Sequence, residues 1–349
     1  MEVREKLPDP PAFAARFRSI EENVEKVVRG KHHEIRLALV ALIAEGHLLI
    51  EDVPGVGKTM LAKSIARSID CSFRRIQFTP DLLPTDVTGV NVFSQETGDF
   101  EFKPGAIFAN IVLGVSVWDR QSDRFEFRPG PIFAGVVLAD EINRASPKTQ
   151  SALLECMEER QVTVDTETHT LGTPFIVIAT QNPIEHEGTY PLPEAQLDRF
   201  MLRLAIGYPS ADVEVEILGS HASGAPLEDI SPVSDAAGVR SMIEDARRVH
   251  AAPAIRRYIV DLVEATRGHS DVYLGASPRA SIMILRAARA LAAAEERDYV
   301  IPDDVKTLAP PALSHRIIVT ADAIMSGRSA DVLVREIVDE VDVPVAENP

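Results

Sequence analysis

The residues best suited to chemistry in this sequence are Lys58 and Thr59, which follow a glycine-rich turn. The apolar run at 48–50 predicts a short buried strand, residues 54–57 break it, and residues 58–68 carry apolar side chains at helical spacing. A strand, a glycine-rich turn and a helix that begins with Lys-Thr are typical of a phosphate-binding loop. In such a loop backbone N–H groups and the helix N-terminus bind phosphate oxygens, Lys58 reaches the β- and γ-phosphates, and the Thr59 hydroxyl binds Mg²⁺.

This loop departs from the general pattern G-x-x-x-x-G-K-[ST] at one position, because Asp52 stands where the first glycine is usual. The phosphate cradle comes mostly from residues 55–59, so we still expect a nucleotide there. The alternative is a glycine-rich turn before a helix that binds nothing. The residues predicted to contact nucleotide are Pro54, Gly55, Val56, Gly57, Lys58, Thr59 and Met60.

Two adjacent carboxylates, Asp140 and Glu141, follow the apolar run at 136–139. In open α/β sheets ligands bind in the crevice outside the carboxyl ends of the strands. Asp140 therefore suits a Mg²⁺ partner, direct or through water, and Glu141 suits the base that polarises the attacking water. The alternative is a solvated acidic strand end without a ligand.

Three further polar residues have positions that suit phosphate chemistry. Asn182 ends another apolar run, at 175–180, where it could hold the lytic water or the γ-phosphate. Arg199 ends a short predicted helix, and Arg279 starts a helix in the C-terminal part of the chain. Phosphoryl transfer needs positive charge, and another subunit can supply it. A plain turn for the asparagine and surface ion pairs for the two arginines are the alternatives.

The elements that must position these residues alternate along the first part of the chain. Strands are predicted at 48–50, 73–78, 135–139, 174–180 and 201–206, with helical stretches between several of them. Near-continuous apolar strands that alternate with helices indicate the α/β class, with a parallel sheet covered on both faces. After Pro209 only helical patterns follow, so we expect an α/β domain over 1–209 and a small all-α lid domain over 210–349.

One segment is present twice. Residues 89–113 repeat as residues 114–138, and 13 of the 25 aligned pairs are identical. Each copy resembles a β-hairpin, with turns near Thr97-Gly98 and Ser122-Asp123. Only the second copy runs into Asp140, so we expect a tandem duplication in which the second copy alone supplies a central strand.

Composition narrows the function further. The net charge of −17, from 53 acidic residues against 36 Lys plus Arg, argues against a protein that coats DNA or anionic membranes. The two cysteines, Cys71 and Cys156, form no disulfide or zinc framework and are interpreted as structural. The N-terminus has no signal-peptide pattern, and no apolar run approaches the ~20 residues of a membrane span. The expected location is cytoplasmic.

Taken together, these motifs identify the chain as a member of the MoxR family of AAA+ ATPases, a resemblance that covers about residues 20 to 320. The motifs that carry it are Glu51-Asp-Val-Pro-Gly-Val-Gly-Lys-Thr59, Phe78-Thr-Pro-Asp-Leu-Leu-Pro-Thr-Asp-Val-Thr-Gly89, Ala139-Asp-Glu-Ile-Asn-Arg-Ala-Ser-Pro-Lys-Thr-Gln-Ser-Ala-Leu-Leu-Glu155, Ala179-Thr-Gln-Asn-Pro-Ile-Glu185, Tyr190-Pro-Leu-Pro-Glu-Ala-Gln-Leu-Asp-Arg-Phe200 and Gly275-Ala-Ser-Pro-Arg-Ala-Ser281. The resemblance implies that residues 54–59 are Walker A and that Asp140 and Glu141 are Walker B. It further implies that Asn182 is sensor 1, Arg279 sensor 2 and Arg199 an arginine finger for the neighbour's ATP, with Val28 and Gly30 near adenine.

The resemblance also implies a function. Such proteins bind ATP with Mg²⁺, form a hexameric ring and act in chaperone-like remodelling, maturation or cofactor loading of client proteins. The partner often has a von Willebrand factor A domain. Hairpins such as 90–102 and 162–171 line the ring pore in relatives. Two alternatives stay open: a helicase-like nucleic-acid motor, which the hairpin residues Lys103, Arg120, Arg124 and Arg128 support only thinly, and a nucleotide-gated scaffold without turnover.

Overall fold

The centre of the protein, seen here in a computed structural model, is a five-stranded sheet in the order β11-β1-β10-β7-β2, with every neighbouring pair parallel. The strands are β1 (Leu48–Glu51), β2 (Phe73–Gln77), β7 (Val136–Asp140), β10 (Ile176–Gln181) and β11 (Leu202–Leu204). All five lie where the sequence predicts them. The structure describes residues 10–79, 90–93, 100–103, 115–119, 124–164, 167–183, 189–221 and 227–344.

Alternation along the strands explains why both sheet faces are covered. Leu48 and Ile50 of β1 belong to one apolar cluster, with the helices α1 (Pro10–Glu25), α2 (His32–Ile43) and α3 (Lys58–Ser68). Leu49 faces the opposite cluster, which includes residues of α6 (Pro147–Glu159). Successive side chains of a strand point to opposite faces, so a strand that is apolar at every position is buried on both sides. The predicted doubly covered sheet is therefore confirmed.

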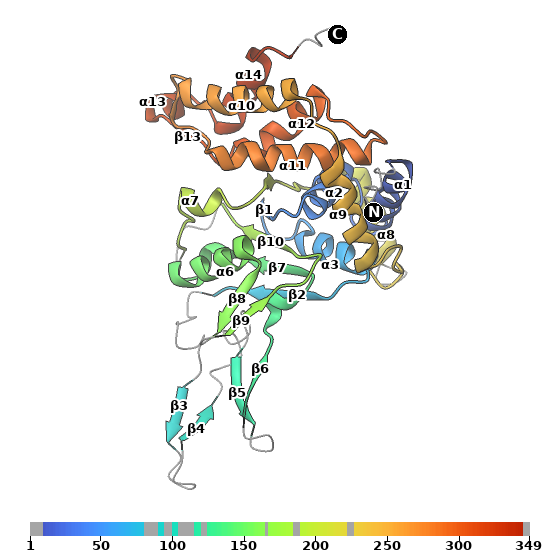
Figure 1. Ribbon diagram of the computed structural model, residues 1–349, viewed down its shortest axis with the longest axis vertical. Helices are drawn as coiled ribbons and strands as arrows, with labels where there is room; N and C mark the ends of the chain where they lie inside the picture. The colour runs from blue at the N-terminus through green and yellow to red at the C-terminus, as the bar shows by residue number, and fades with distance from the viewer. Residues whose placement is uncertain are drawn as a thin grey trace, which may run out of the picture.

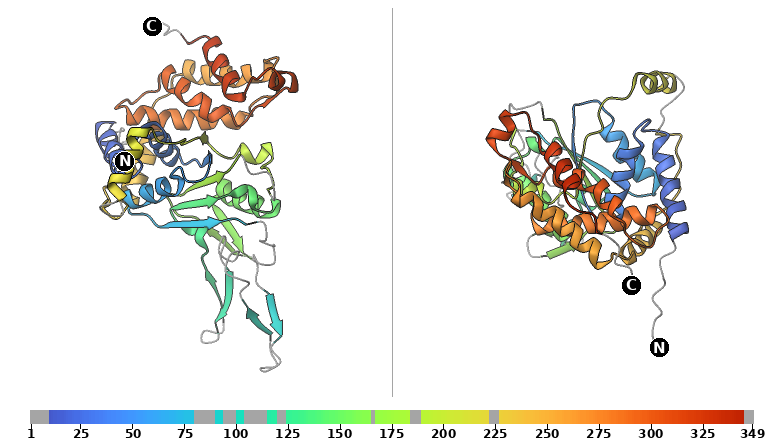
Figure 2. Two further views of the ribbon diagram at one scale, coloured as in Figure 1. Left: turned by 180° about the vertical axis from the view of Figure 1, so that it is seen from behind. Right: turned by 90° about the horizontal axis from the view of Figure 1, so that it is seen from above.

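Helices dominate the C-terminal part, as predicted; those from residue 253 onward form a layer at one end of the molecule, whereas the two before them lie alongside the sheet domain (Figures 1 and 2). They are α8 (Ala211–His221), α9 (Ala236–Arg248), α10 (Pro253–Gly268), α11 (Pro278–Ala294), α12 (Pro302–Leu313), α13 (Ala321–Met325) and α14 (Ala330–Glu340). The Ser277 side chain caps α11 by accepting a hydrogen bond from the Arg279 N–H at 3.2 Å, and Pro278 is the first helical residue. α11 contacts α1 and α2 on one side and α10 and α12 on the other, so one apolar cluster runs from the sheet into the lid.

The lid also contains a small sheet that the sequence analysis did not predict. β12 (Val272–Leu274) pairs antiparallel with β13 (Ile318–Val319). Strands of three and two residues are too short to show a period-two pattern. The proposed boundary between residues 209 and 210 stays a prediction. Within the described part of the chain, no helix is both long and apolar enough to cross a membrane.

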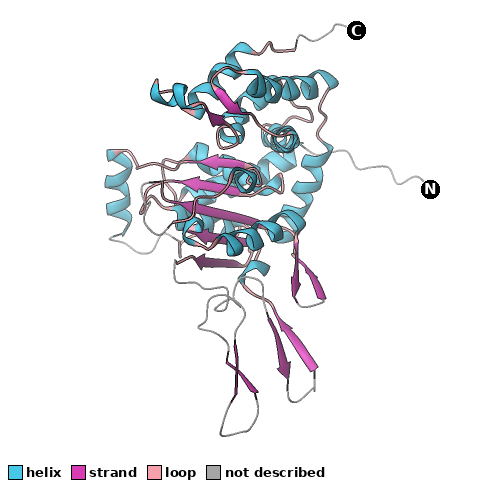
Figure 3. Cartoon of the chain, turned by 90° about the vertical axis from the view of Figure 1, so that its left-hand side faces the viewer, coloured by secondary structure: helices cyan, strands magenta, loops and turns pink. Residues whose placement is uncertain are grey.

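Both copies of the repeat contain an antiparallel hairpin, and both hairpins point away from the lid (Figures 1 and 3). They are β3 (Val90–Phe93) with β4 (Phe100–Lys103), and β5 (Val115–Asp119) with β6 (Arg124–Arg128). The second copy continues into the central strand β7, as predicted. The corresponding residues 107–113 and both predicted turns lie outside the described residues. A third hairpin, β8 (Gln161–Val164) with β9 (Glu167–Thr170), agrees with the prediction for residues 162–171.

Candidate functional site

A cavity of about 350 Å³ opens at the carboxyl ends of β1, β7 and β10. It is lined by Pro54, Gly55, Gly57, Lys58, Thr59, Met60, Arg75, Asp140, Glu141, Thr180 and Asn182. Because these strands are parallel neighbours, the segments that leave their carboxyl ends meet at one edge of the sheet. The structure thus brings together the predicted loop residues 54, 55 and 57–60, both carboxylates and Asn182.

The loop after β1 is shaped by two glycines. Gly55 has φ +88° and Gly57 has φ +93°, left-handed values that strain any residue with a Cβ. A Cβ at either glycine would meet no atom within 4 Å, so the requirement is conformational and not one of space. Lys58 begins α3, and its Nζ donates to the Asp52 carbonyl at 2.6 Å. The N–H groups at the start of α3 and the Lys58 charge give this edge the character of an anion site.

Asp52, the residue that breaks the general loop pattern, has a structural role here. Its Oδ1 accepts from the Val53 N–H at 2.8 Å, and its Oδ2 accepts from the Gly207 N–H at 2.5 Å. Gly207 follows β11, the strand next to β1, and has φ +67°. The carboxylate therefore fastens the start of the loop to the segment that leads toward α8, a connection that a glycine could not make.

The two carboxylates after β7 are held by different partners. Thr180 of β10 donates its hydroxyl to Asp140 Oδ1 and accepts the Glu141 N–H at 2.9 Å. Glu141 has the left-handed values φ 57° and ψ 49°, a strained backbone for a residue other than glycine that is common at functional sites. The Glu141 Oε2 accepts from Gln77 Nε2 at 2.9 Å and lies 3.0 Å from Arg144 Nε.

The Asp140 carboxylate forms an ion pair with the guanidinium of Arg75. Arg75 of β2 places Nε at 3.0 Å and Nη2 at 2.5 Å from Asp140 Oδ2. A hydroxyl at Thr59 and a carboxylate at Asp140 in one cavity are the oxygen ligands that Mg²⁺ prefers, and phosphates complete such sites. In the described part of the chain no set of three His, Cys, Asp or Glu side chains could hold a metal. The donor set thus fits a Mg²⁺ ion that arrives with a nucleotide.

Several predicted site residues do not line this cavity. Arg199 Nε lies 3.2 Å from Glu158 Oε2, and Arg279 pairs with the same Glu158. Val28 is buried in the core and Val56 packs against it. Gly30 has φ +69°, and a Cβ there would come within 2.9 Å of Val213 of α8. The roles of these residues stay predictions.

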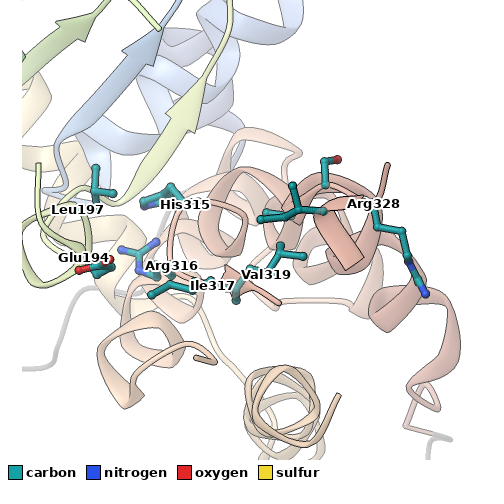
Figure 4. A pocket seen from close by; sticks show the side chains of 11 residues that line it. Glu194, Leu197, His315, Arg316, Ile317, Val319 and Arg328 are labelled. Carbon is teal, nitrogen blue, oxygen red and sulfur yellow. The ribbon is translucent and has the colours of Figure 1, made fainter. Parts of the chain in front are cut away.

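A larger cavity, of about 480 Å³, lies between α7 (Glu194–Leu197) and the lid (Figure 4). Its walls are mainly apolar, with His315 and Arg316 at one end. Burial lowers the pKa of Arg316 to about 10, although Asp198 opposes this by accepting from Arg316 Nε at 2.8 Å. Burial also lowers the pKa of His315 well below its usual value, and His315 Nε2 lies 3.0 Å from the Phe200 carbonyl. These groups join the lid to the sheet domain, and this cavity has neither a phosphate loop nor paired carboxylates.

Four residues at the site were missed by the sequence analysis: Arg75, Gln77, Arg144 and Thr180. Arg75 and Gln77 lie two apart on β2 and face the same side of the sheet, whereas Ile76 between them is buried. That alternation was visible in the sequence. What the sequence did not show is that β2 pairs with β7, which places Gln77 opposite Asp140.

A parallel sheet with a phosphate loop after one strand, paired carboxylates after a second, a polar residue after a third and a helical lid defines the AAA+ class of ATPases. The family described as "ATPase family associated with various cellular activities (AAA)" matches residues 47–114 and 112–202, and an AAA lid domain matches residues 264–337. The two matched segments meet at residues 112–114, where the first copy of the repeat ends and the second begins.

Named relatives narrow the class to a family. The chain is 39% identical over 330 residues to Chaperone MoxR1 of Mycobacterium tuberculosis, covering 92% of this chain and 80% of that protein. It is 30% identical to Protein MoxR of Paracoccus denitrificans, covering 87% and 88%, and 48% identical to the uncharacterized protein YeaC of Bacillus subtilis, covering 93% of each. A crystal structure from Cytophaga hutchinsonii, assigned as a candidate ATPase, has a TM-score of 0.83 at 35% identity and covers 96% and 97% of the two chains. The chain belongs to the MoxR family of AAA+ ATPases.

Proposed function

We propose that this protein binds ATP with Mg²⁺ in the cavity at the carboxyl ends of β1, β7 and β10 and hydrolyses it. The observation that carries the proposal is the convergence of Lys58, Thr59, Asp140, Glu141 and Asn182 on one cavity of about 350 Å³. These residues come from three separate strand ends. A structural role would not require a lysine, a hydroxyl, two carboxylates and an amide to share a single concave space.

Each side chain has a distinct role in this proposal. The loop N–H groups and Lys58 Nζ bind the phosphate oxygens, and Lys58 exchanges its contact with the Asp52 carbonyl for them. Thr59 and Asp140 hold the Mg²⁺ ion, which when bound neutralises phosphate charge. A Glu141 carboxylate oxygen accepts the proton of the attacking water, and Asn182 orients that water or the γ-phosphate. The Gln77 and Arg144 contacts fix the Glu141 carboxylate at the cavity edge.

Arg199 completes the site of a neighbouring copy as an arginine finger in this proposal, and Arg279 acts as sensor 2. Both arginines contact Glu158, and neither is among the residues that line the cavity of their own chain. If Arg199 acts in trans, each contact between copies is heterologous, and such contacts must close into a ring to give a finite assembly. We propose the hexameric ring of the family, with Val28 and Gly30 near the adenine of the bound nucleotide.

The proposed role of turnover is chaperone-like remodelling, maturation or cofactor loading of a client protein. One relative at 39% identity is named a chaperone, which supports this choice. A client or partner with a von Willebrand factor A domain and a cytoplasmic location are parts of the same proposal. The net charge of −17 argues against a nucleic-acid motor, because phosphate backbones are bound by positive surfaces.

Two substitutions test the site directly. Lys58→Ala should weaken ATP binding by about 100-fold or more, because a buried phosphate charge loses its cation. Glu141→Gln should keep ATP binding and lower turnover by about 10²- to 10⁴-fold, the usual contribution of a positioned base. Binding is measured with a fluorescent ATP analogue and turnover by phosphate release.

Lys148→Ala is the matched control, because Lys148 is also in the first turn of a helix but is exposed and is not among the residues that line the cavity. It should bind and hydrolyse ATP as the wild-type protein does. Turnover by Glu141→Gln at the original rate would show that the assigned base is wrong. If the wild-type protein binds ATP but does not hydrolyse it, the protein is a nucleotide-gated scaffold instead.

A further inference from the structure

Arg75 is a charged residue of the cavity whose role the proposed ATPase cycle does not explain. It lies on β2, the edge strand of the sheet, and its side chain is 48% exposed. The Asp140 side chain is 13% exposed. Both hydrogen bonds from Arg75 to Asp140, at 3.0 and 2.5 Å, end on the same oxygen, Oδ2. The other oxygen, Oδ1, accepts the Thr180 hydroxyl.

The position of the guanidinium follows from strand pairing. Gln77 of β2 lies opposite Asp140 of β7, and Arg75 precedes Gln77 by two residues on the same face. Arg75 Nη2 also donates to Gln77 Oε1 at 2.6 Å, and Gln77 Nε2 donates to Glu141 Oε2 at 2.9 Å. One guanidinium therefore touches the first carboxylate directly and the second through an amide.

A mostly buried carboxylate needs a positive partner, because an uncompensated charge in a poorly hydrated place is unfavourable. We propose that Arg75 is the resident counter-cation of the Mg²⁺ site, holding Asp140 Oδ2 while the metal is absent and leaving it when Mg²⁺ and nucleotide enter. This inference rests on the proposed ATP site. Arg75 then competes with the metal for one oxygen, so it sets how much Mg²⁺ the protein needs.

Arg75 suits this exchange better than a fixed structural arginine would. Its side chain is half-exposed, so the guanidinium can turn into water or toward phosphate oxygens without leaving a cavity in the core. The Asp140 side chain cannot follow it, because Thr180 holds Oδ1 from the neighbouring strand. The carboxylate thus stays in place while its partner changes.

The test measures Mg²⁺ dependence in Arg75→Ala. Binding of a fluorescent ATP analogue is titrated with MgCl₂ at constant ionic strength, and the Mg²⁺ concentration for half-maximal binding should fall about tenfold, the effect of removing one charge-assisted competitor. Arg74→Ala is the matched control, since Arg74 is the adjacent exposed arginine on the same strand. It should leave that concentration unchanged.

A second measurement needs no nucleotide. The melting temperature of nucleotide-free Arg75→Ala should rise with MgCl₂ beyond its rise with NaCl at equal ionic strength, whereas Arg74→Ala and the unchanged protein should show no such difference. Arg75→Gln gives the same comparison if Arg75→Ala does not fold. In an Asp140→Asn background, Arg75→Ala should no longer shift the Mg²⁺ requirement.

The inference is overturned if Arg75→Ala needs as much Mg²⁺ as the Arg74→Ala control, or needs more of it. A higher requirement would mean that Arg75 assists the metal-bound state. Failure of the unchanged protein to bind the ATP analogue would overturn the proposed function instead. In that case the melting comparison would still decide whether Arg75 and Mg²⁺ share Asp140.

Discussion

His47 shows how a single buried residue makes stability depend on pH. Its Nε2 lies 3.0 Å from the Met157 carbonyl, and its Nδ1 lies 3.0 Å from the Val177 backbone N. The Val177 N–H is a donor, so Nδ1 must accept and Nε2 must carry the proton of a neutral ring. Burial lowers the pKa of His47 to about 4, although the hydrogen bond to Met157 works in the opposite direction. The ring connects β10 to α6 without a charge.

We predict that the free energy of unfolding falls as the pH is lowered from 6.5 toward 4. The unfolded chain gains a proton on His47 near pH 6.5, whereas the folded chain gains one only near pH 4, so stability is lost across that window and not below it. The loss from this residue is about 3 kcal/mol. His315, whose pKa is also lowered by burial, acts in the same direction.

Urea denaturation at pH 7 and pH 4.5 checks this prediction. The variant His47→Gln has no titrating ring at this position and should lose less stability between the two pH values. It should also be less stable than the unchanged protein at pH 7, because Gln cannot reproduce both ring contacts. Equal losses in the two proteins over this range would contradict the assignment.

At the residue scale, the sequence predicted the side chains that lie at the ends of strands or in the segments that follow them. Lys58, Asp140, Glu141 and Asn182 each come soon after an apolar run, so local pattern alone places them at one sheet edge. Arg75 was not predicted, because its contact depends on which strand β2 pairs with and in which register. Such pairing is a non-local property that no motif in this chain encodes.

Several elements meet at Glu45, in the turn between α2 and β1. Its carboxylate accepts from Arg160 Nη1 at 2.6 Å, at the end of α6, and from Arg247 of α9. Arg286 of α11 lies 3.4 Å from Glu45 Oε2. Burial acts to raise the pKa of Glu45, but the three arginines outweigh it and the pKa is lowered. The backbone carbonyl of Arg160 accepts a hydrogen bond from the Leu171 N–H, so this junction connects the lid helices to the base of the β8–β9 hairpin.

We predict that Glu45→Gln destabilises the protein by about 2 kcal/mol, because it leaves three arginines without their shared carboxylate. Glu296→Gln removes the exposed pair with Arg18 and should cost less than about 0.5 kcal/mol. Guanidinium chloride raises ionic strength and would mask the difference, so urea is the denaturant of choice. Equal stability of the two variants would show that the Glu45 junction contributes no more than a surface pair.

Elements with long apolar patterns were predictable, and elements set by contacts across the molecule were not. The five strands of the sheet and α11 with its Ser277 cap lie where sequence pattern and capping chemistry place them. β12 and β13 form because the segments that follow α10 and α12 meet in the lid. A sequence pattern of two or three residues is too short to predict this pairing. The repeat did reveal β7, because only its second copy leads into Asp140.

At the scale of the whole molecule, Arg199 and Arg279 do not line the cavity that contains the phosphate loop of their own chain. Arg199 and Arg279 share Glu158 and also lie near Asp198, which accepts the Ser277 hydroxyl at 2.8 Å and Arg316 Nε at 2.8 Å. This network connects α6, the α7 region and the lid, and neither arginine is among the residues that line the cavity. Under the proposed function we therefore expect Arg199 to act on the nucleotide of a second copy.

Mixing two inactive variants tests that arrangement. Arg199→Ala keeps its own loop but cannot supply the arginine, and Lys58→Ala supplies the arginine but cannot bind nucleotide. Co-expressed in equal amounts, they should recover about one quarter of the original ATP turnover. In a closed heterologous ring of randomly mixed copies, about one site in every four combines an intact loop from one copy with an intact arginine from the next. Either variant alone should stay near background, because such an arginine raises the rate of ATP turnover about 10³-fold or more.

Two further pairs are the controls. Arg199→Ala co-expressed with Glu141→Gln should recover activity by the same rule. Lys58→Ala co-expressed with Glu141→Gln should not, because both substitutions lie in the half of the site that one copy supplies. If Arg199 acted on its own chain, no co-expressed pair of variants would show more ATP turnover than the sum of the two variants measured separately.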